Sequence, residues 1–426
     1  MAIVKAQWLS AFQHRNFRLV WTGQVTSQVG SAGHTIAVSF FIKEAFQSGT
    51  IVGSVAFFSG LASILCLPLS GVLADRHNRR TIILICDALN AFSALILGLM
   101  FLVLPSGSMS LAYAAVLCTF LVRLTSTFFR PAFGATLPDL VPRAVLSQAN
   151  AVYKAGARGG DLARQALGGF VYRWLGPGTL FLLDALSYFV ALWCVFRTKP
   201  ASLFVPKSTS GSPENEGVIR EFMQGVRAIT KIPGGAIFLS MALLINFFAT
   251  PIFVLMPFHV TDYLQGDAAT LGVIVGALSA GVLAGYALAA RWSIAKGGST
   301  VILTTIVVMS AFFIIFSISR NFIISCTSLF LAGVANGYWS IYFETTLQRM
   351  VRREALGRVY ACFGLLSAGL TPAAALAGGL ALDLLNQRTT ILFLVCSILM
   401  TLYPLTLFFN QKFLSFFDRL ADVNSD

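Results

Sequence analysis

The stretch Gly71–Arg80 reads GVLADRHNRR and places an aspartate, a histidine and three arginines between two apolar runs. The runs on either side, at about 50–73 and 81–104, carry almost no charge. Apolar runs of about 20 residues match the roughly 30 Å hydrocarbon core of a bilayer, where charge is costly. The stretch is therefore predicted to be a short connection at one membrane face between two spanning helices.

The composition of the whole chain supports this interpretation. Of the 426 residues, 57% are hydrophobic and 11% are charged, whereas soluble domains carry about 25% charged residues. The mean hydropathy is +0.79. The chain is predicted to be a helical integral membrane protein, because β-barrel strands would instead appear as alternating segments of about ten residues.

Twelve apolar runs of spanning length follow one another, and a polar stretch separates the first six from the last six. They lie at about 17–42, 50–73, 81–104, 109–129, 146–172, 178–196, 236–261, 269–291, 300–318, 322–344, 357–382 and 388–410. This pattern predicts an all-α integral membrane fold of two pseudo-symmetric six-helix bundles. The predicted parts are 1–197, a cytoplasmic linker at 198–235, and 236–426.

The two halves also share a sequence feature. GVLADRHNRR follows the second span, and GYALAARWSIAKGG, from Gly285, follows the eighth. Parallel six-span repeats are typical of transporters. In the eighth span, Gly272 with Gly276 and Gly281 with Gly285 have the small-xxx-small spacing that predicts close contact with another helix.

Positive charge dominates the polar segments. The net charge is +13, and most of the 30 lysines and arginines fall on one side of the predicted membrane. The positive-inside rule then places both termini and the linker in the cytoplasm, so the charge does not call for a nucleic-acid partner. The seven cysteines stand singly in apolar runs, so no metal or cofactor is predicted. No nucleotide-binding or catalytic motif occurs, which argues against an enzyme.

The motif GVLADRHNRR resembles the loop Gly-x-Leu-Ala-Asp-Arg-x-Gly-Arg-Arg of the major facilitator superfamily. Asn78 stands at the family's glycine and also tolerates left-handed backbone angles. LPDLVPRAVLSQANAV (137–152) and MVRREALGRVYACFG (350–364) are similar to segments of the macrolide-efflux and enterobactin-exporter branch. The resemblance implies two bundles around a central cavity, a bacterial cytoplasmic (inner) membrane location, and a monomer that moves a small molecule with protons.

The resemblance also implies that the charged loop is a conformational latch. In the family its aspartate, here Asp75, faces the start of the eleventh helix near Gly357 and Arg358. The alternative is that the arginines only orient membrane insertion. The predicted latch residues are Gly71, Asp75, Arg76, Arg79, Arg80, Asp87, Arg130, Gly357 and Arg358.

Ionisable residues inside spans need a specific reason. In the fifth span, Lys154, Arg158 and Asp161 share one helical face. That face is expected to line a water-filled cavity, or alternatively to form salt bridges between helices. Asp161 is predicted to be the proton-coupling carboxylate. Asp184 in the sixth span is the second candidate and is expected to pair with a fifth-span arginine.

Polar residues of several spans are predicted to bind the substrate. The first span has a polar stripe along one face, and the resemblance places the first, fourth, fifth, seventh, tenth and eleventh helices around the cavity. A packing role remains the alternative for the histidine, tryptophan and tyrosine of this set. The set is Gln24, Gln28, Ser31, His34, Arg123, Arg158, Arg164, Asn246, Asn336, Trp339 and Tyr342.

Cations outnumber acids among the residues predicted to lie midspan. A cavity with spare arginines favours carboxylates, so the substrate is predicted to be a small, amphipathic, carboxylate-bearing compound. The branch resemblance suggests a siderophore or a macrolide-like compound that is exported. Import of an anionic nutrient, flipping of a lipid or lysolipid, and a receptor or scaffold role are the alternatives.

Overall fold

The structure, a computed structural model, is helical throughout its described regular elements. It describes residues 10–410 and Leu414, except 32–33, 106–107, 143–144, 199–222, 224–225, 228, 232–233, 292–297 and 352. In 157–171 and at some other helical positions it describes the backbone but not the side chains. The predicted all-α membrane fold is confirmed.

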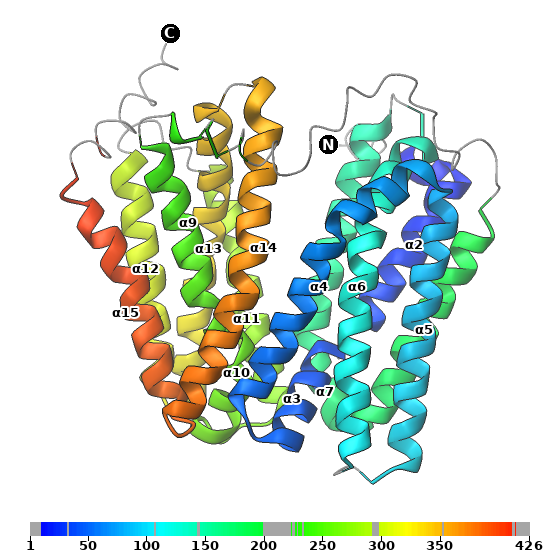
Figure 1. The fold of residues 1–426 in the computed structure, drawn as a ribbon, viewed down its shortest axis with the longest axis horizontal. Helices are drawn as coiled ribbons and strands as arrows, with labels where there is room; N and C mark the ends of the chain where they lie inside the picture. The colour runs from blue at the N-terminus through cyan, green and yellow to red at the C-terminus, as the bar shows by residue number, and fades with distance from the viewer. Residues whose placement is uncertain are drawn as a thin grey trace. The chain divides into compact units, whose positions relative to one another are not determined.

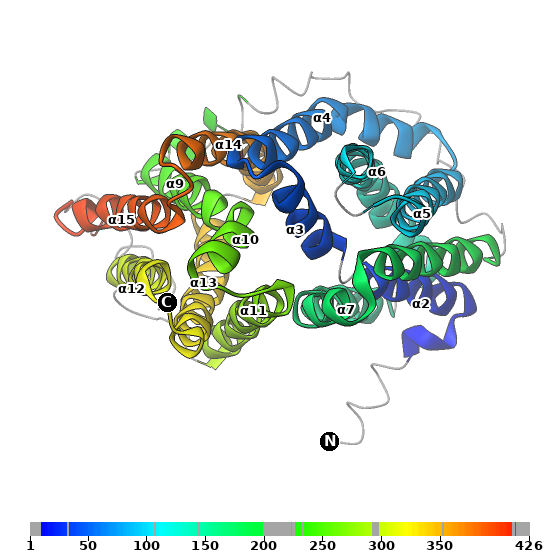
Figure 2. The ribbon, with the colours of Figure 1, turned by 90° about the horizontal axis from the view of Figure 1, so that it is seen from below.

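The chain packs as two compact units, and the first comprises Met1–Gln47 with Leu61–Gly211. Within it, α2 and α7 run side by side, and α5 packs against both α6 and α7 (Figures 1 and 2). The elements up to the end of this unit are η1 (Ser10–Gln13), α2 (Arg15–Gly30), α3 (His34–Phe46), α4 (Gly49–Arg76), α5 (Arg79–Val103), α6 (Met109–Leu140) and α7 (Leu146–Phe196).

The second unit comprises Ser48–Gly60 with Ser212–Asp426. Here α11 packs along α13, and α12 packs against both α13 and α15 (Figure 1). Its further elements are α9 (Gly235–Val254), α10 (Met256–Phe258), η3 (His259–Tyr263), α11 (Ala268–Arg291), α12 (Gly298–Ile318), α13 (Phe322–Met350), α14 (Arg353–Leu384) and α15 (Thr389–Leu407).

Ten helices in the described part of the chain are long and apolar enough to cross a membrane. They match all predicted spans except the first and the fifth. The first is divided into the shorter helices α2 and α3, and the fifth falls in the early part of α7. A turn at Gly176, whose φ of 72° suits glycine, precedes Pro177 and separates the fifth span from the sixth.

The charged stretch forms the predicted connection between two spans. Helix α4 ends at Arg76 and α5 begins at Arg79. Asn78 is the N-cap of α5, and its side chain accepts a hydrogen bond from the Arg80 N–H. Its φ of −64° is ordinary, so asparagine serves here as a helix cap and not as a residue that replaces a left-handed glycine.

Helix α4 is divided between the two units, because Ser48–Gly60 packs with the second unit. The predicted first bundle, 1–197, includes this segment, so the predicted bounds differ here from the observed units. Asp383, near the end of α14, accepts hydrogen bonds from Ser48 Oγ (2.7 Å) and from the N–H groups of Gly49 (2.8 Å) and Thr50 (2.9 Å). The first N–H groups of a helix lack partners within it, and a carboxylate there also meets the positive end of the dipole.

Glycines bring α11 and α13 into direct backbone contact. A Cβ on Gly281 would lie 2.0 Å from the Phe330 carbonyl oxygen, and the Cβ positions of Gly285, Gly333 and Gly337 each fall 2.2 Å from a carbonyl oxygen of the other helix. The close contact predicted from Gly281 and Gly285 is therefore confirmed.

The substitution Gly281→Val tests this contact. We expect it to force α11 and α13 apart and to destabilise the protein by about 1–3 kcal/mol, measured as a lower Tm in detergent. Gly369→Ala in α14 is the control, since its added Cβ meets nothing within 4 Å, and its Tm should equal or slightly exceed that of the wild type. A wild-type Tm for Gly281→Val would contradict the contact.

Candidate functional site

The first unit holds a buried polar cluster made of Ser31, His34, Asp184 and Tyr188. Asp184 has no exposed surface and His34 is 6% exposed. His34 Nδ1 lies 2.7 Å from Asp184 Oδ2, and the Ser31 hydroxyl donates to Asp184 Oδ1 at 2.6 Å. The Tyr188 hydroxyl lies 3.2 Å from Ser31 Oγ. Both carboxylate oxygens are thus occupied, as a buried charge requires.

The cluster joins the end of α2 and the start of α3 to one face of α7. Helix α2 ends at Gly30 and α3 begins at His34, so Ser31 and His34 lie at the ends of two helices. A Cβ on Gly30 would fall 2.0 Å from Ser187 Oγ, which shows how closely α2 approaches α7. In α7, Asp184 and Tyr188 are spaced i, i+4 and present one face toward the break.

The surroundings of the cluster are apolar on one side and polar on the other. The Phe181 ring meets the His34 ring edge-on at 5.1 Å. Asp87 of α5 and Cys118 of α6 are also buried in the first unit. Two buried atoms, His34 Nε2 and Asp87 Oδ2, have no hydrogen-bond partner among the residues that the structure describes. Such atoms are costly in an apolar interior, so they indicate a functional constraint or a place for water.

The arrangement is suited to holding a proton. When His34 is neutral, the His34–Asp184 pair carries one negative charge, and when His34 is protonated the pair is neutral. No set of three or more His, Cys, Asp and Glu side chains in the described part of the chain is arranged to hold a metal ion.

The polar stripe predicted for the first span lies partly on this buried face. Gln24 is 4% exposed with its Nε2 unpartnered, and Gln28 and Ser31 are half-buried. Of the fourth-span candidates, Arg123 is exposed. The predicted pairing of Asp184 with a fifth-span arginine lies outside the described side chains; the described partners of Asp184 are His34 and Ser31.

The candidates of the second unit lie in different surroundings. Trp339 is buried in an aromatic cluster, with ring contacts to Phe238 at 6.0 Å and Phe343 at 5.5 Å. Asn336 Nδ2 donates to Met309 Sδ at 3.7 Å, whereas Asn246 is exposed and donates to a carbonyl of its own helix. Tyr342 is half-buried.

Several predicted residues fall where the structure describes no side chains. In the fifth span these are Lys154, Arg158, Asp161 and Arg164. In the predicted latch they are Gly71, Asp75, Arg76, Gly357 and Arg358. Their proposed roles stay predictions from the sequence.

The described latch residues mostly bind within the first unit. Arg79 forms an ion pair with Asp139 of α6 at 3.4 Å, and Arg80 donates to the carbonyl oxygens of Val195 and Phe196. Asp87 is 2% exposed inside the unit, and Arg130 is exposed. The sequence analysis did not single out Asp139 or Tyr188. For Tyr188 a signal was present, namely its i, i+4 spacing from Asp184 in an apolar span.

Comparisons with known proteins agree with a transporter. A family model described as a transmembrane secretion effector matches residues 6–417. The macrolide efflux protein A of Streptococcus pyogenes is 23% identical over 363 residues, which is 82% of this chain and 84% of that protein. The enterobactin exporter EntS of Shigella boydii is 27% identical over 355 residues, 81% of this chain and 80% of that protein.

Solved structures show the same fold at low sequence identity. The nucleoside transporter NupG superposes with a TM-score of 0.73 at 11% identity, covering 94% of this chain and 99% of that one. A bacterial homologue of the iron transporter ferroportin gives 0.66 at 16% identity, covering 92% and 98%. The fold and the comparisons together define a transporter of the major facilitator superfamily. Within it, the chain belongs to the transmembrane secretion effector family.

A double-mutant cycle tests whether His34 and Asp184 act as a pair. Removing one partner of a buried ion pair leaves the other uncompensated, so we expect His34→Gln and Asp184→Asn to be non-additive, with a coupling free energy above about 1 kcal/mol. The measurement is the free energy of unfolding in detergent.

The control cycle uses Arg79→Gln and Asp139→Asn. Those side chains are 17% and 31% exposed, and partly exposed pairs are worth about 0–1 kcal/mol. Additive effects at His34 and Asp184, within about 0.5 kcal/mol, would contradict the pairing.

Proposed function

We propose that this transporter is a proton-coupled exporter of a small, amphipathic, carboxylate-bearing compound, a siderophore or a macrolide-like molecule. The observation that carries the proposal is the buried His34–Asp184 pair at the break in the first span. Ionisable residues inside membrane spans typically mark ion pathways and proton relays. Discontinuous spanning helices typically form the binding sites of secondary transporters.

The substrate class rests on charge and on the relatives. Arg123, Arg158 and Arg164 are midspan cations in the sequence, and guanidinium groups pair well with carboxylates. The relatives that export macrolides and enterobactin favour export over import of an anionic nutrient and over lipid flipping. The remaining substrate candidates are Gln24, Gln28, Asn246, Asn336, Trp339 and Tyr342.

Proton binding would couple to conformation through the charge of the pair. With one proton the pair is neutral overall, and without it Asp184 leaves a net negative charge in an apolar interior. Because an uncompensated buried charge is costly, the protonated pair favours the closed surroundings and the deprotonated pair favours hydration. Ser31 transmits the change, since its hydroxyl bonds to the same carboxylate next to the helix break.

The remaining assignments follow from the sequence. Asp161 is proposed as a second proton-binding carboxylate, and Asp75 with its neighbouring arginines as the latch. The distribution of cations supports a location in the bacterial cytoplasmic membrane with both termini inside. The protein is proposed to act as a monomer.

Transport in proteoliposomes tests the proposal. A pH-sensitive dye is enclosed, a proton gradient is imposed, and a carboxylate-type siderophore, the macrolide erythromycin and the cationic dye ethidium are added in turn. We expect proton movement with the carboxylate-bearing or macrolide probe, and a loss of at least about tenfold in Asp184→Asn, because proton transfer needs a group of suitable protonation state.

Two further variants sharpen the result. Asp161→Asn shows whether the fifth-span carboxylate shares the coupling. Glu344→Gln is the matched control, because Glu344 is an exposed carboxylate and its loss should leave proton movement unchanged. The proposal would be contradicted if only ethidium drove proton movement, or if Asp184→Asn moved protons as fast as the wild type. Transport of the probe in the direction opposite to export would show that the protein is an importer.

A further inference from the structure

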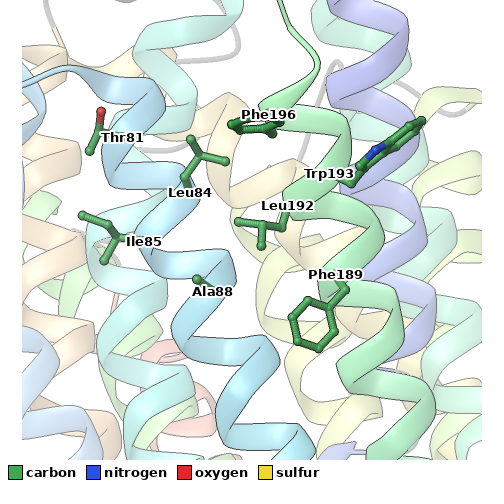
Figure 3. A pocket seen from close by; sticks show the side chains of 8 residues that line it. All are labelled: Thr81, Leu84, Ile85, Ala88, Phe189, Leu192, Trp193 and Phe196. Carbon is green, nitrogen blue, oxygen red and sulfur yellow. The ribbon is translucent and has the colours of Figure 1, made fainter.

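An apolar groove of about 590 Å³ opens on the outer surface of the first unit between α5 and α7 (Figure 3). The polar side-chain groups of its lining are the Thr81 hydroxyl and the Trp193 indole N–H, and the rest is hydrocarbon. In Figure 3, Leu84 and Ala88 of α5 face Leu192 and Phe189 of α7. Its main lining residues are Leu84, Ile85 and Ala88 of α5 with Phe189, Trp193 and Phe196 of α7.

The helical spacing of these residues explains the groove. On each helix the lining positions recur every three or four residues, so they form one stripe. Ala88 is the small residue of the α5 stripe, and it leaves a hollow opposite the Phe189 ring. Ile85, Trp193 and Phe196 are 54%, 57% and 67% exposed. In a spanning protein such a surface faces lipid, and a long hollow of this kind fits an acyl chain better than a flat surface does.

Two arginines stand at one end of the groove. The Arg80 guanidinium lies 5.8 Å from the centre of the Phe196 ring, and that of Arg197 lies 5.4 Å from the centre of the Trp193 ring. No carboxylate among the described residues pairs with either arginine. Both cations are held beside the aromatic lining, and neither forms an ion pair with a side chain that the structure describes.

The hydrogen bonds of Arg80 leave it able to bind an anion. Its Nε and Nη2 donate to the carbonyl oxygens of Val195 and Phe196 at the end of α7, so the side chain is fixed across the two helices. Guanidinium has five N–H donors, and the Nη1 group remains available. Helix α5 also begins here, at Arg79, and the positive end of its dipole adds to the same field.

We propose that this groove binds an anionic phospholipid, with an acyl chain along the apolar lining and the phosphate headgroup at Arg80 and Arg197. Guanidinium groups pair closely with phosphate oxygens. Trp193 lies where a tryptophan is favoured, at the boundary between hydrocarbon and headgroups. The positive-inside prediction puts this end at the cytoplasmic leaflet, whose anionic lipids attract basic residues at the surface. The proposal does not depend on the transported substrate.

Quenching of tryptophan fluorescence by brominated lipids measures this binding directly. The full chain is reconstituted with phosphatidylglycerol or phosphatidylcholine carrying brominated acyl chains. The chain has 6 tryptophans, so the difference between wild type and Trp193→Phe isolates the signal at the groove. We expect phosphatidylglycerol to be preferred there, and the preference to fall about fivefold for each arginine removed, by Arg197→Gln and by Arg80→Gln.

Matched variants separate this site from general lipid contact. Arg18→Gln removes an exposed arginine of α2 that does not line the groove and should leave the preference unchanged. Ala88→Phe fills the hollow and should reduce quenching of Trp193 by both lipids. Because Arg80 also bridges α5 and α7, Arg197→Gln alone serves if the Arg80 variant misfolds. Equal binding of the two lipids at Trp193, or an unchanged preference in Arg197→Gln, would overturn the proposal.

Discussion

The fully buried carboxylate of Asp184 is the constraint around which the first unit is organised. An ionised carboxylate in an apolar interior is tolerated only when its oxygens are bonded and its charge is balanced. His34 and Ser31 meet both needs. Their i, i+3 spacing lets both side chains face α7 from the same side of the first span.

The sequence alone predicts the features that depend on hydrophobicity and on close backbone contact. The membrane-spanning helices follow from apolar length, and the tight contact of α11 with α13 follows from Gly281 and Gly285, because only a missing Cβ permits it. The pairing of His34 with Asp184 could not be predicted, since it joins residues 150 positions apart. The expected pairing of Asp184 with an arginine of the fifth span lies outside the described side chains and stays a prediction.

Two further features depend on geometry that spacing does not contain. Asn78 was expected to replace a glycine because asparagine tolerates left-handed backbone angles. Its side chain instead caps α5, a role that depends on where the helix begins. The first part of α4 was assigned to the first bundle because it belongs to that half of the sequence, whereas it packs with the second unit. Hydropathy predicts the length of a spanning helix, but it does not predict which other helices it packs against.

The short helix α3 is bordered at both ends by a serine bound to a carboxylate. Ser31 precedes it and donates to Asp184, and Ser48 follows it and donates to Asp383. A hydrogen bond to an ionised carboxylate is stronger than one between neutral groups, so adding a proton to either carboxylate weakens the adjoining contact. The charge of these two aspartates therefore acts on the chain next to each end of α3.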